Sequence, residues 1–233
     1  MKSFEKNPPA DLRRSPATRE RKRGRPKADT SDSIDEARLL QTAFAMFAAH
    51  GYEASTLRAM ARELDVSHNL LNVRFGRKSE LWKAAVDWRL AAAAQDIEPA
   101  FTDGNEPEDQ LRDLVHRFCR WAIINSDIVA ISQQEGQQES WRLEYLIAEF
   151  VLPFQKRLQK LLADVALERK LTPIDSGALL ALMVHGVGLY FALRPLHNKL
   201  LPDQGNAGAM PGDLGAHADA MAEFLLAGLF AGK

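Results

Sequence analysis

The chain has 233 residues, of which 46% are hydrophobic and 26% are charged, and its formal net charge is −1. This length suits one elaborate domain or two modest ones, and this composition is that of a soluble globular protein rather than a fibrous or wholly disordered one. The single cysteine, the charged N-terminus and a longest apolar run of 16 residues exclude a disulfide framework, a signal peptide and a membrane span, and they predict a cytoplasmic protein.

Charge and composition divide the chain into three regions, 1–33, 34–94 and 95–233. The first holds ten Lys/Arg against five Asp/Glu, whereas the remaining 200 residues hold 20 basic and 26 acidic side chains. A basic end indicates a polyanionic partner, although a solvated tail kept soluble by its charges explains the same pattern. Because the first region is nearly free of large apolar residues, we expect it to be disordered in isolation.

The second region has apolar residues at the spacing of short α-helices. Its first helix should end at Gly51, because glycine accepts the left-handed backbone found just past a helix end. A second helix opens at Ser55-Thr56, which are good N-cap residues, a third covers 67–75, and a fourth begins near Lys78. No alternating strand pattern persists anywhere in the chain, so the predicted fold class is all-α.

The third region reads as longer helices punctuated by Pro and Gly. The expected helices are 107–124, 127–134, 140–169 with a kink at Pro153, a helix to residue 193 opened by Thr172-Pro173, and 213–230, with a loop over 197–212. Two segments, 179–193 and 214–230, carry broad apolar faces, so they must be buried in a core or against a partner.

Residues 57–75 have the spacing of a helix-turn-helix. This motif needs a small residue where two short helices cross, a turn residue that tolerates a left-handed backbone, and an apolar residue after it. Ala61, Asp65 and Val66 stand at those places. Ser67 then caps the second helix, whose early side chains can enter the major groove of DNA. A helical hairpin without a DNA partner satisfies the same spacing.

Residues 34–86 resemble the N-terminal domain of the tetracycline-repressor (TetR) family of one-component bacterial transcription regulators. The matching features, in order, are Phe47, Gly51-Tyr52, Ser55-Thr56, Met60-Ala61, Val66-Ser67, Leu71, Phe75, Lys78 and Leu81. Asp65 departs from the usual Gly or Asn, Asn72 from the usual phosphate-contacting Tyr, and Arg74 from the usual His. The resemblance therefore implies DNA binding, but it does not transfer the sequence preference of other members.

Roles on DNA follow from the chemistry of each side chain. The N-termini of the second and third helices offer free N–H groups to phosphate, Asn pairs well with adenine, and Arg pairs well with guanine. The candidates for phosphate contacts are Ser55, Thr56 and Lys78, followed by Arg58 and Arg77. The candidates for contacts with base edges are His68, Asn69, Asn72 and Arg74, which follow the cap residue Ser67. The side chains expected in the core are Leu70, Leu71, Val73 and Phe75. A solvated polar face is the alternative for each polar candidate.

The basic first region contains Lys22-Arg23-Gly24-Arg25-Pro26-Lys27, which resembles an AT-hook. Glycine lets the backbone approach the floor of the minor groove, and proline holds the strand extended. Arg23 and Arg25 would meet the enhanced negative potential of A·T-rich DNA. We expect this arm to grip the minor groove beside the operator half-site.

Residues 95–233 hold 12 basic and 19 acidic side chains, which makes a poor surface for DNA. The TetR resemblance implies that this region encloses a pocket for a small-molecule effector of unknown identity and forms a homodimer through 179–193 and 214–230. Effector binding would then move the helix that starts near Lys78. The pocket candidates are Phe118, Trp121, Trp141, Tyr145, Phe150, His185 and Tyr190, with Gln133, Gln134, Glu135 and Arg142 as polar partners; plain core and a solvated face are the alternatives.

The sequence thus predicts an all-α regulator of double-stranded DNA, with an N-terminal helix-turn-helix domain and a C-terminal effector-binding and dimerisation domain. The resemblance favours a repressor that binds an inverted repeat as a dimer. The chain has no Gly-rich phosphate loop after a strand, no nucleophile elbow and no closely spaced Cys/His set, so we expect no catalytic residue, cofactor or metal. An architectural protein that coats DNA without register is the alternative.

Overall fold

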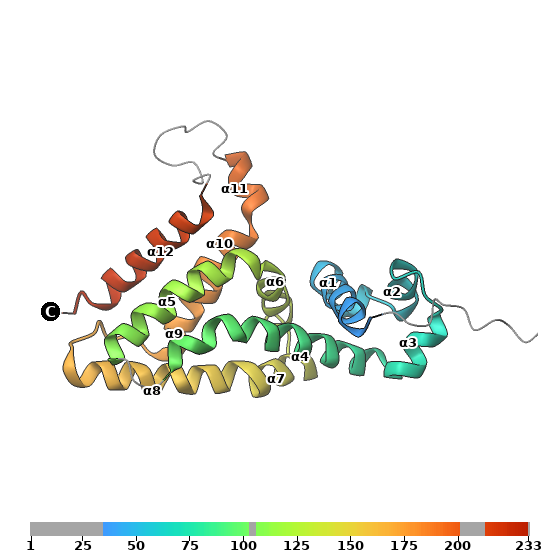
Figure 1. Ribbon diagram of the computed structural model, residues 1–233, viewed down its shortest axis with the longest axis horizontal. Helices are drawn as coiled ribbons and strands as arrows, with labels where there is room; N and C mark the ends of the chain where they lie inside the picture. Colours follow the sequence, from blue (N-terminus) through green and yellow to red (C-terminus); the bar gives the residue numbers. More distant parts are fainter. Residues whose placement is uncertain (1–34, 103–105, 201–212, 233) are drawn as a thin grey trace, which may run out of the picture. The chain divides into compact units, whose positions relative to one another are not determined.

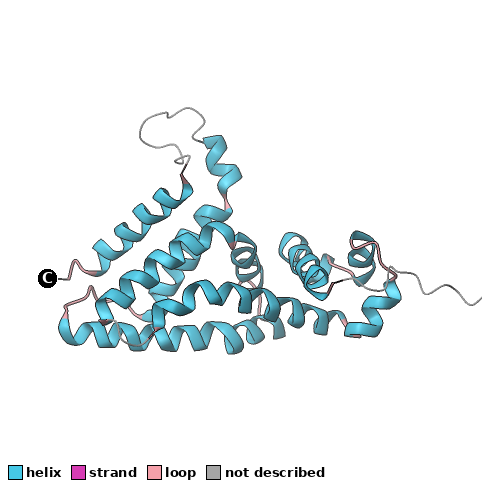
Figure 2. Cartoon of the chain, viewed as in Figure 1, coloured by secondary structure: helices cyan, strands magenta, loops and turns pink. Residues whose placement is uncertain are grey.

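The computed structural model describes residues 35–102, 106–200 and 213–232, in which helices follow one another with short connections (Figure 1). Figure 2 shows helices and loops, and the described ranges contain no strand, which confirms the predicted all-α fold. No helix within those ranges is both long and apolar enough to span a bilayer. The AT-hook-like residues Arg23 and Arg25 lie outside the described part of the chain.

The N-terminal helices are α1 (Glu36–Ala54), α2 (Leu57–Glu63), α3 (His68–Phe75) and α4 (Lys78–Ile97). They share one core, in which Phe44, Met60, Leu71 and Trp82 are at most 2% exposed. Gly51 has φ +77°, as predicted, and α1 resumes for one further turn beyond that break. α4 continues past residue 94 into the second half of the fold.

The C-terminal helices follow in chain order. They are the 3-10 turn η2 (Glu98–Phe101), α5 (Pro107–Ile124), α6 (Ser126–Glu135), α7 (Trp141–Leu146), the π-helical η3 (Ile147–Val151), α8 (Leu152–Glu168), α9 (Ser176–Ala181), the π-helical η4 (Leu182–Gly188), α10 (Leu189–Ala192), α11 (Arg194–Leu200) and α12 (Leu214–Leu229). α5 packs against α4, α8, η4 and α12, so it is the centre of this core. Trp121 on α5 packs against both cores and joins them.

Two π-helical segments replace the regular helices that the spacing predicts. In the first, η3 separates α7 from α8 and ends two residues before Pro153, which has no amide hydrogen to donate to the carbonyl of Glu149. The amide of Leu152 donates to the carbonyl of Ile147, five residues back. This bond is that of a π turn, which holds one residue more than an α-helical turn and lies next to the proline. The backbone thus continues through the predicted kink site with a local change of pitch.

The predicted helix start at Thr172-Pro173 is wrong. α9 begins at Ser176, and Asp175 caps it by accepting from the amide of Ala178 at 2.8 Å. The hydroxyl of Thr172 instead donates to the carbonyl of Gly228 at 2.7 Å, which ties this turn to α12. The predicted loop over 197–212 is also wrong in its first residues, because α11 extends to Leu200; residues 201–212 lie outside the described ranges.

Candidate DNA-binding surface and effector cavity

The turn between α2 and α3 has the geometry that the motif requires. Asp65 has φ +53°, and the amide of Val66 donates to the carbonyl of Ala61 at 2.9 Å across the turn. The hydroxyl of Thr56 accepts from the amide of Ala59 at 3.1 Å, and that of Ser67 accepts from the amide of Leu70 at 3.2 Å. Both caps therefore fix the starts of α2 and α3, and they confirm the predicted helix boundaries.

Replacing Asp65 with glycine should raise the free energy of unfolding by about 0.5 kcal/mol. Glycine adopts a positive φ without the steric cost that a side chain adds, although its extra freedom in the unfolded chain offsets part of the gain. Replacing Asp65 with valine should lower the free energy by more than about 1 kcal/mol, because a β-branched residue fits this region worst. Urea denaturation of both variants measures the difference, and a destabilised glycine variant would contradict this account.

α3 presents a mixed outer face above one buried side chain. Leu71 is fully buried, whereas His68, Asn69 and Arg74 are exposed and Asn72 is half-buried. The side-chain amide of Asn72 donates to Nδ1 of His68 at 3.1 Å. The guanidinium of Arg74 donates to Glu36 on α1 at 2.6 Å, so in this conformation it is held against its own domain.

Val73 is 76% exposed, so the expectation that it belongs to the core is wrong. Successive residues of an α-helix turn by about 100°, which places Val73 roughly 200° from the buried Leu71. The helical period itself could therefore have placed this residue outside. An exposed aliphatic side chain on a recognition helix can contact the methyl group of thymine.

The phosphate candidates differ in how free they are. Ser55 is 1% exposed, and its hydroxyl donates to the carbonyls of Gly51 at 2.7 Å and Met46 at 3.2 Å. It therefore stabilises the end of α1 and is not accessible to a phosphate. Nζ of Lys78 donates to the carbonyl of Tyr52 at 2.9 Å and lies 4.0 Å from the centre of its ring. The exposed Thr56 keeps its hydroxyl hydrogen, and Arg58 and Arg77 are exposed as well.

Trp141 and Tyr145, expected in the pocket, instead pack against the N-terminal core. The ring of Trp141 lies 5.7 Å from that of Tyr52 and 5.3 Å from that of Trp82. The hydroxyl of Tyr145 donates to Asp87 on α4 at 2.6 Å, and burial together with this bond raises the pKa of Tyr145. α7 therefore joins the C-terminal helices to the DNA-binding ones.

Three of the polar pocket candidates also lie at this junction, and none of the four lines the cavity. Nε of Arg142 donates to both carboxylate oxygens of Glu135 at 2.9 and 2.8 Å, and these residues are 9% and 4% exposed. The amide of Gln134 donates to the carbonyl of Ala48 on α1 at 2.6 Å. Gln133 lies instead beside His185, 3.3 Å from its Nδ1.

His185 and Tyr190 also lie away from the cavity. His185 is exposed on η4. The ring of Tyr190 stacks between two imidazoles, 4.4 Å from His197 and 5.1 Å from His217. Burial lowers the pKa of His217, which favours its neutral form in this stack. These side chains thus pack α10 against α11 and α12.

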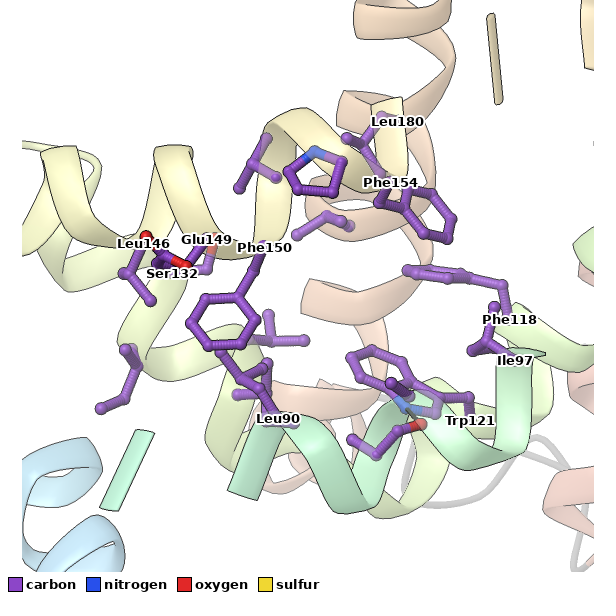
Figure 3. Close-up of a pocket in the computed structure, with 18 of the residues that line it drawn as sticks. Leu90, Ile97, Phe118, Trp121, Ser132, Leu146, Glu149, Phe150, Phe154 and Leu180 are labelled. Carbon is purple, nitrogen blue, oxygen red and sulfur yellow. Dashed lines mark hydrogen bonds between the residues drawn. The ribbon is translucent and has the colours of Figure 1, made fainter. Parts of the chain in front are cut away.

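A cavity of about 370 Å³ lies among α4, α5, α6 and the segment from α7 to α8. Of the pocket candidates, Phe118, Trp121 and Phe150 line it, and Figure 3 shows all three at its wall. The volume is within the usual range for small-molecule sites. The lining residues that sequence reasoning missed are chiefly Phe44, Leu90, Ile97, Glu98, Phe101, Ser132, Glu149, Phe154 and Arg157.

Cys119 is fully buried on α5, and burial raises the pKa of its thiol to about 12. Because the thiolate is the form that reacts with oxidants, this cysteine is a packing residue in the native fold.

Comparison with known proteins identifies the N-terminal domain. Residues 39–85 match the family model described as bacterial regulatory proteins, tetR family. These residues form a DNA-binding domain of the TetR type. The match runs from α1 through the helix-turn-helix to α4, and it confirms the resemblance carried by Phe47, Met60-Ala61 and Val66-Ser67. No curated protein sequence matches the chain significantly.

Solved structures show that the likeness of fold extends over most of this chain. The ketosteroid transcriptional regulator KstR2 of Mycobacterium tuberculosis is 17% identical, with a TM-score of 0.60 over 83% of this chain and 93% of its own. A tetR-family regulatory protein from Rhodococcus RHA1 is 20% identical, with a TM-score of 0.61 over 84% and 98%. AibR, solved with isovaleryl coenzyme A and operator DNA, is 14% identical, with a TM-score of 0.63 over 85% and 100%.

Proposed function

We propose that the protein is a dimeric one-component repressor that binds an inverted-repeat operator in the cytoplasm and leaves it when a small molecule enters the cavity. The observation that carries this proposal is that one helix, α4, contributes both to the core of the DNA-binding helices and to the wall of the cavity. α4 begins in the core of the DNA-binding helices, where Leu81 and Trp82 are fully buried, and its later residues Leu90, Ala93 and Ile97 line the cavity. A ligand that displaces α4 would therefore displace α3 with it.

The dimer is proposed from an exposed apolar face on α12. Phe224 is 80% exposed there, and Ala220 and Ala227 lie on the same exposed face, one helical turn to either side. Leu182 on η4 and Leu193 after α10, in the other segment expected at the interface, are exposed as well. A two-fold interface on this surface would present two copies of α3 to the two halves of an inverted repeat.

AibR supports the proposal that the cavity binds a small molecule, because the AibR structure holds isovaleryl coenzyme A together with operator DNA. The same combination of a DNA site and a ligand cavity is proposed for this protein.

Selection of bound duplexes from random DNA, followed by footprinting of the selected site, tests the proposal against the architectural alternative. We expect one inverted repeat protected over a discrete length, with a 1:1 ratio of protomers to half-sites. Protection that spreads along the DNA without a fixed register would favour an architectural protein.

Replacing Asn69 or Lys78 with alanine should change DNA binding in different ways. Asn69 is exposed at the start of α3, so its loss should relax the preference at one base pair by about 1–3 kcal/mol. Two N–H groups of Lys78 remain beyond its bond to Tyr52, so its loss should weaken binding on every sequence and lower the salt slope by about one. The same random selection and salt titrations measure both effects.

Lys156→Ala is the matched control, because this lysine is exposed on α8 and away from the DNA-binding helices. Wild-type preference in Asn69→Ala, or equal losses in Lys78→Ala and Lys156→Ala, would contradict the assignments.

We also propose that Val73 contacts the methyl group of a thymine. Val73→Ala should therefore lose the preference for thymine at one position of the selected site.

The arm is proposed to hold the minor groove through Arg23 and Arg25. Removing residues 1–28 should lower operator affinity and flatten its dependence on salt concentration, because fewer phosphate counterions are released. Binding titrations at several salt concentrations check this, and an unchanged slope would count against the arm.

A further inference from the structure

The wall of the cavity is rich in aromatic rings and poor in hydrogen-bond donors. The aromatic side chains that line it are Phe44, Phe101, Phe118, Trp121, Phe150 and Phe154, and Figure 3 labels the last four. The indole N–H of Trp121 already donates to the carbonyl of Ala93 at 3.1 Å. Aromatic faces carry partial negative charge, so this wall attracts cations and offers little to an anion.

The charged groups of the lining leave one carboxylate without a partner. Arg157 is the one cationic side chain among the described lining residues, and its two terminal nitrogens donate to Glu98 at 2.8 and 2.9 Å. This pairing holds the pKa of Glu98 below its usual range, and the guanidinium also lies 4.0 Å from the centre of the Phe101 ring. Glu149 is exposed at the rim of the cavity, and no hydrogen bond or ion pair joins it to any described residue.

The π turn brings Glu149 to the cavity together with its neighbours. Ile147, Glu149, Phe150 and Val151 all line the cavity, whereas an ordinary α-helix presents residues three or four apart on one face. The wider face of η3 therefore places an exposed carboxylate and an aromatic ring on one side of the cavity. In Figure 3, Glu149 is drawn with Ser132 and Leu146 at one end of the cavity, and Phe118 and Trp121 lie at the other.

We propose that the effector is a lipophilic cation, with an apolar or aromatic body and one amine or quaternary ammonium group. The body lies between the rings, and the cationic end lies beside Glu149, with the hydroxyl of Ser132 as a further acceptor. An anionic ligand would have to break the Arg157–Glu98 pair and would still meet the charge of Glu149. This inference rests on the proposed function, because it names the ligand of the same cavity.

Three probes that share one body test the charge preference: phenylbutylamine, which is protonated at neutral pH, phenylbutanol and phenylbutanoate. Calorimetric titration of the DNA-free, full-length protein should show the amine binding about five-fold more tightly than the alcohol, and the carboxylate more weakly than either. Glu149→Gln should lower the affinity for the amine about five-fold and leave the alcohol unchanged. Glu168→Gln, which removes an exposed carboxylate at the far end of α8, should change neither.

Tighter binding of the alcohol or the carboxylate, an amine affinity that Glu149→Gln does not change, or no binding of any probe would overturn the proposal. Because DNA is absent, the result is separable from operator recognition. An amine that binds through Glu149 to a protein that selects no operator would uphold the ligand class while the repressor proposal fails.

Discussion

Replacing Arg142 with methionine is expected to lower the free energy of unfolding by about 3–5 kcal/mol, among the largest effects of any single substitution in this chain. Arg142 bonds to Glu135 on α6, its guanidinium lies 4.4 Å from the centre of the Tyr52 ring, and its Nη1 lies 3.6 Å from Glu53 on α1. Methionine would leave the carboxylate of Glu135, which is 4% exposed, buried without a counter-charge. Urea denaturation followed by tryptophan fluorescence measures the loss.

Arg120→Met is the matched control for this change. Arg120 donates to both oxygens of Asp219 at 2.8 Å, the same kind of pair as that of Arg142, but its side chain is 63% exposed. An exposed pair contributes at most about 1 kcal/mol, so this variant should lose far less stability. The double variant Glu135→Gln/Arg142→Met should recover part of the loss, because no buried charge remains. Equal losses in Arg142→Met and Arg120→Met would show that the buried pair does not hold the junction.

The position of Arg142 also bears on release from DNA. α7 places Trp141, Arg142 and Tyr145 against the DNA-binding helices, and its residues Leu143 and Leu146 line the cavity. A ligand that moves α7 would thus act on α1 and α4 directly. The geometry gives the proposed coupling two routes from the cavity, one along α4 and one through α7.

Local rules were enough to predict the DNA-binding half of the molecule. The cap at Thr56, the left-handed turn residue Asp65 and the cap at Ser67 each depend on neighbours within four residues, so their residue types determine the backbone. Val73 was misplaced although its helical period points outward, because an aliphatic residue was assigned to the core by type alone.

The cavity could be predicted only in part, because its walls are set by contacts between distant helices. Phe118, Trp121 and Phe150 line it, but nothing in the local spacing distinguishes them from Trp141 and Tyr145, which α7 turns toward the N-terminal core. The prediction of where α9 begins was wrong for a similar reason. Thr172 is a plausible cap by type, yet its hydroxyl is taken by the carbonyl of Gly228, 56 residues away.

Replacing Phe224 with glutamate should convert the proposed dimer into a monomer and weaken binding to the inverted repeat at least about 100-fold, because each protomer would bury an unpaired carboxylate in the shared face. Sedimentation and operator titration measure the two effects, and the variant should retain binding to an isolated half-site. Leu167→Glu is the control, since Leu167 is 85% exposed on α8 and lies outside the α12 face. If Phe224→Glu sediments as the wild type does and keeps its operator affinity, the dimer interface lies on a different surface.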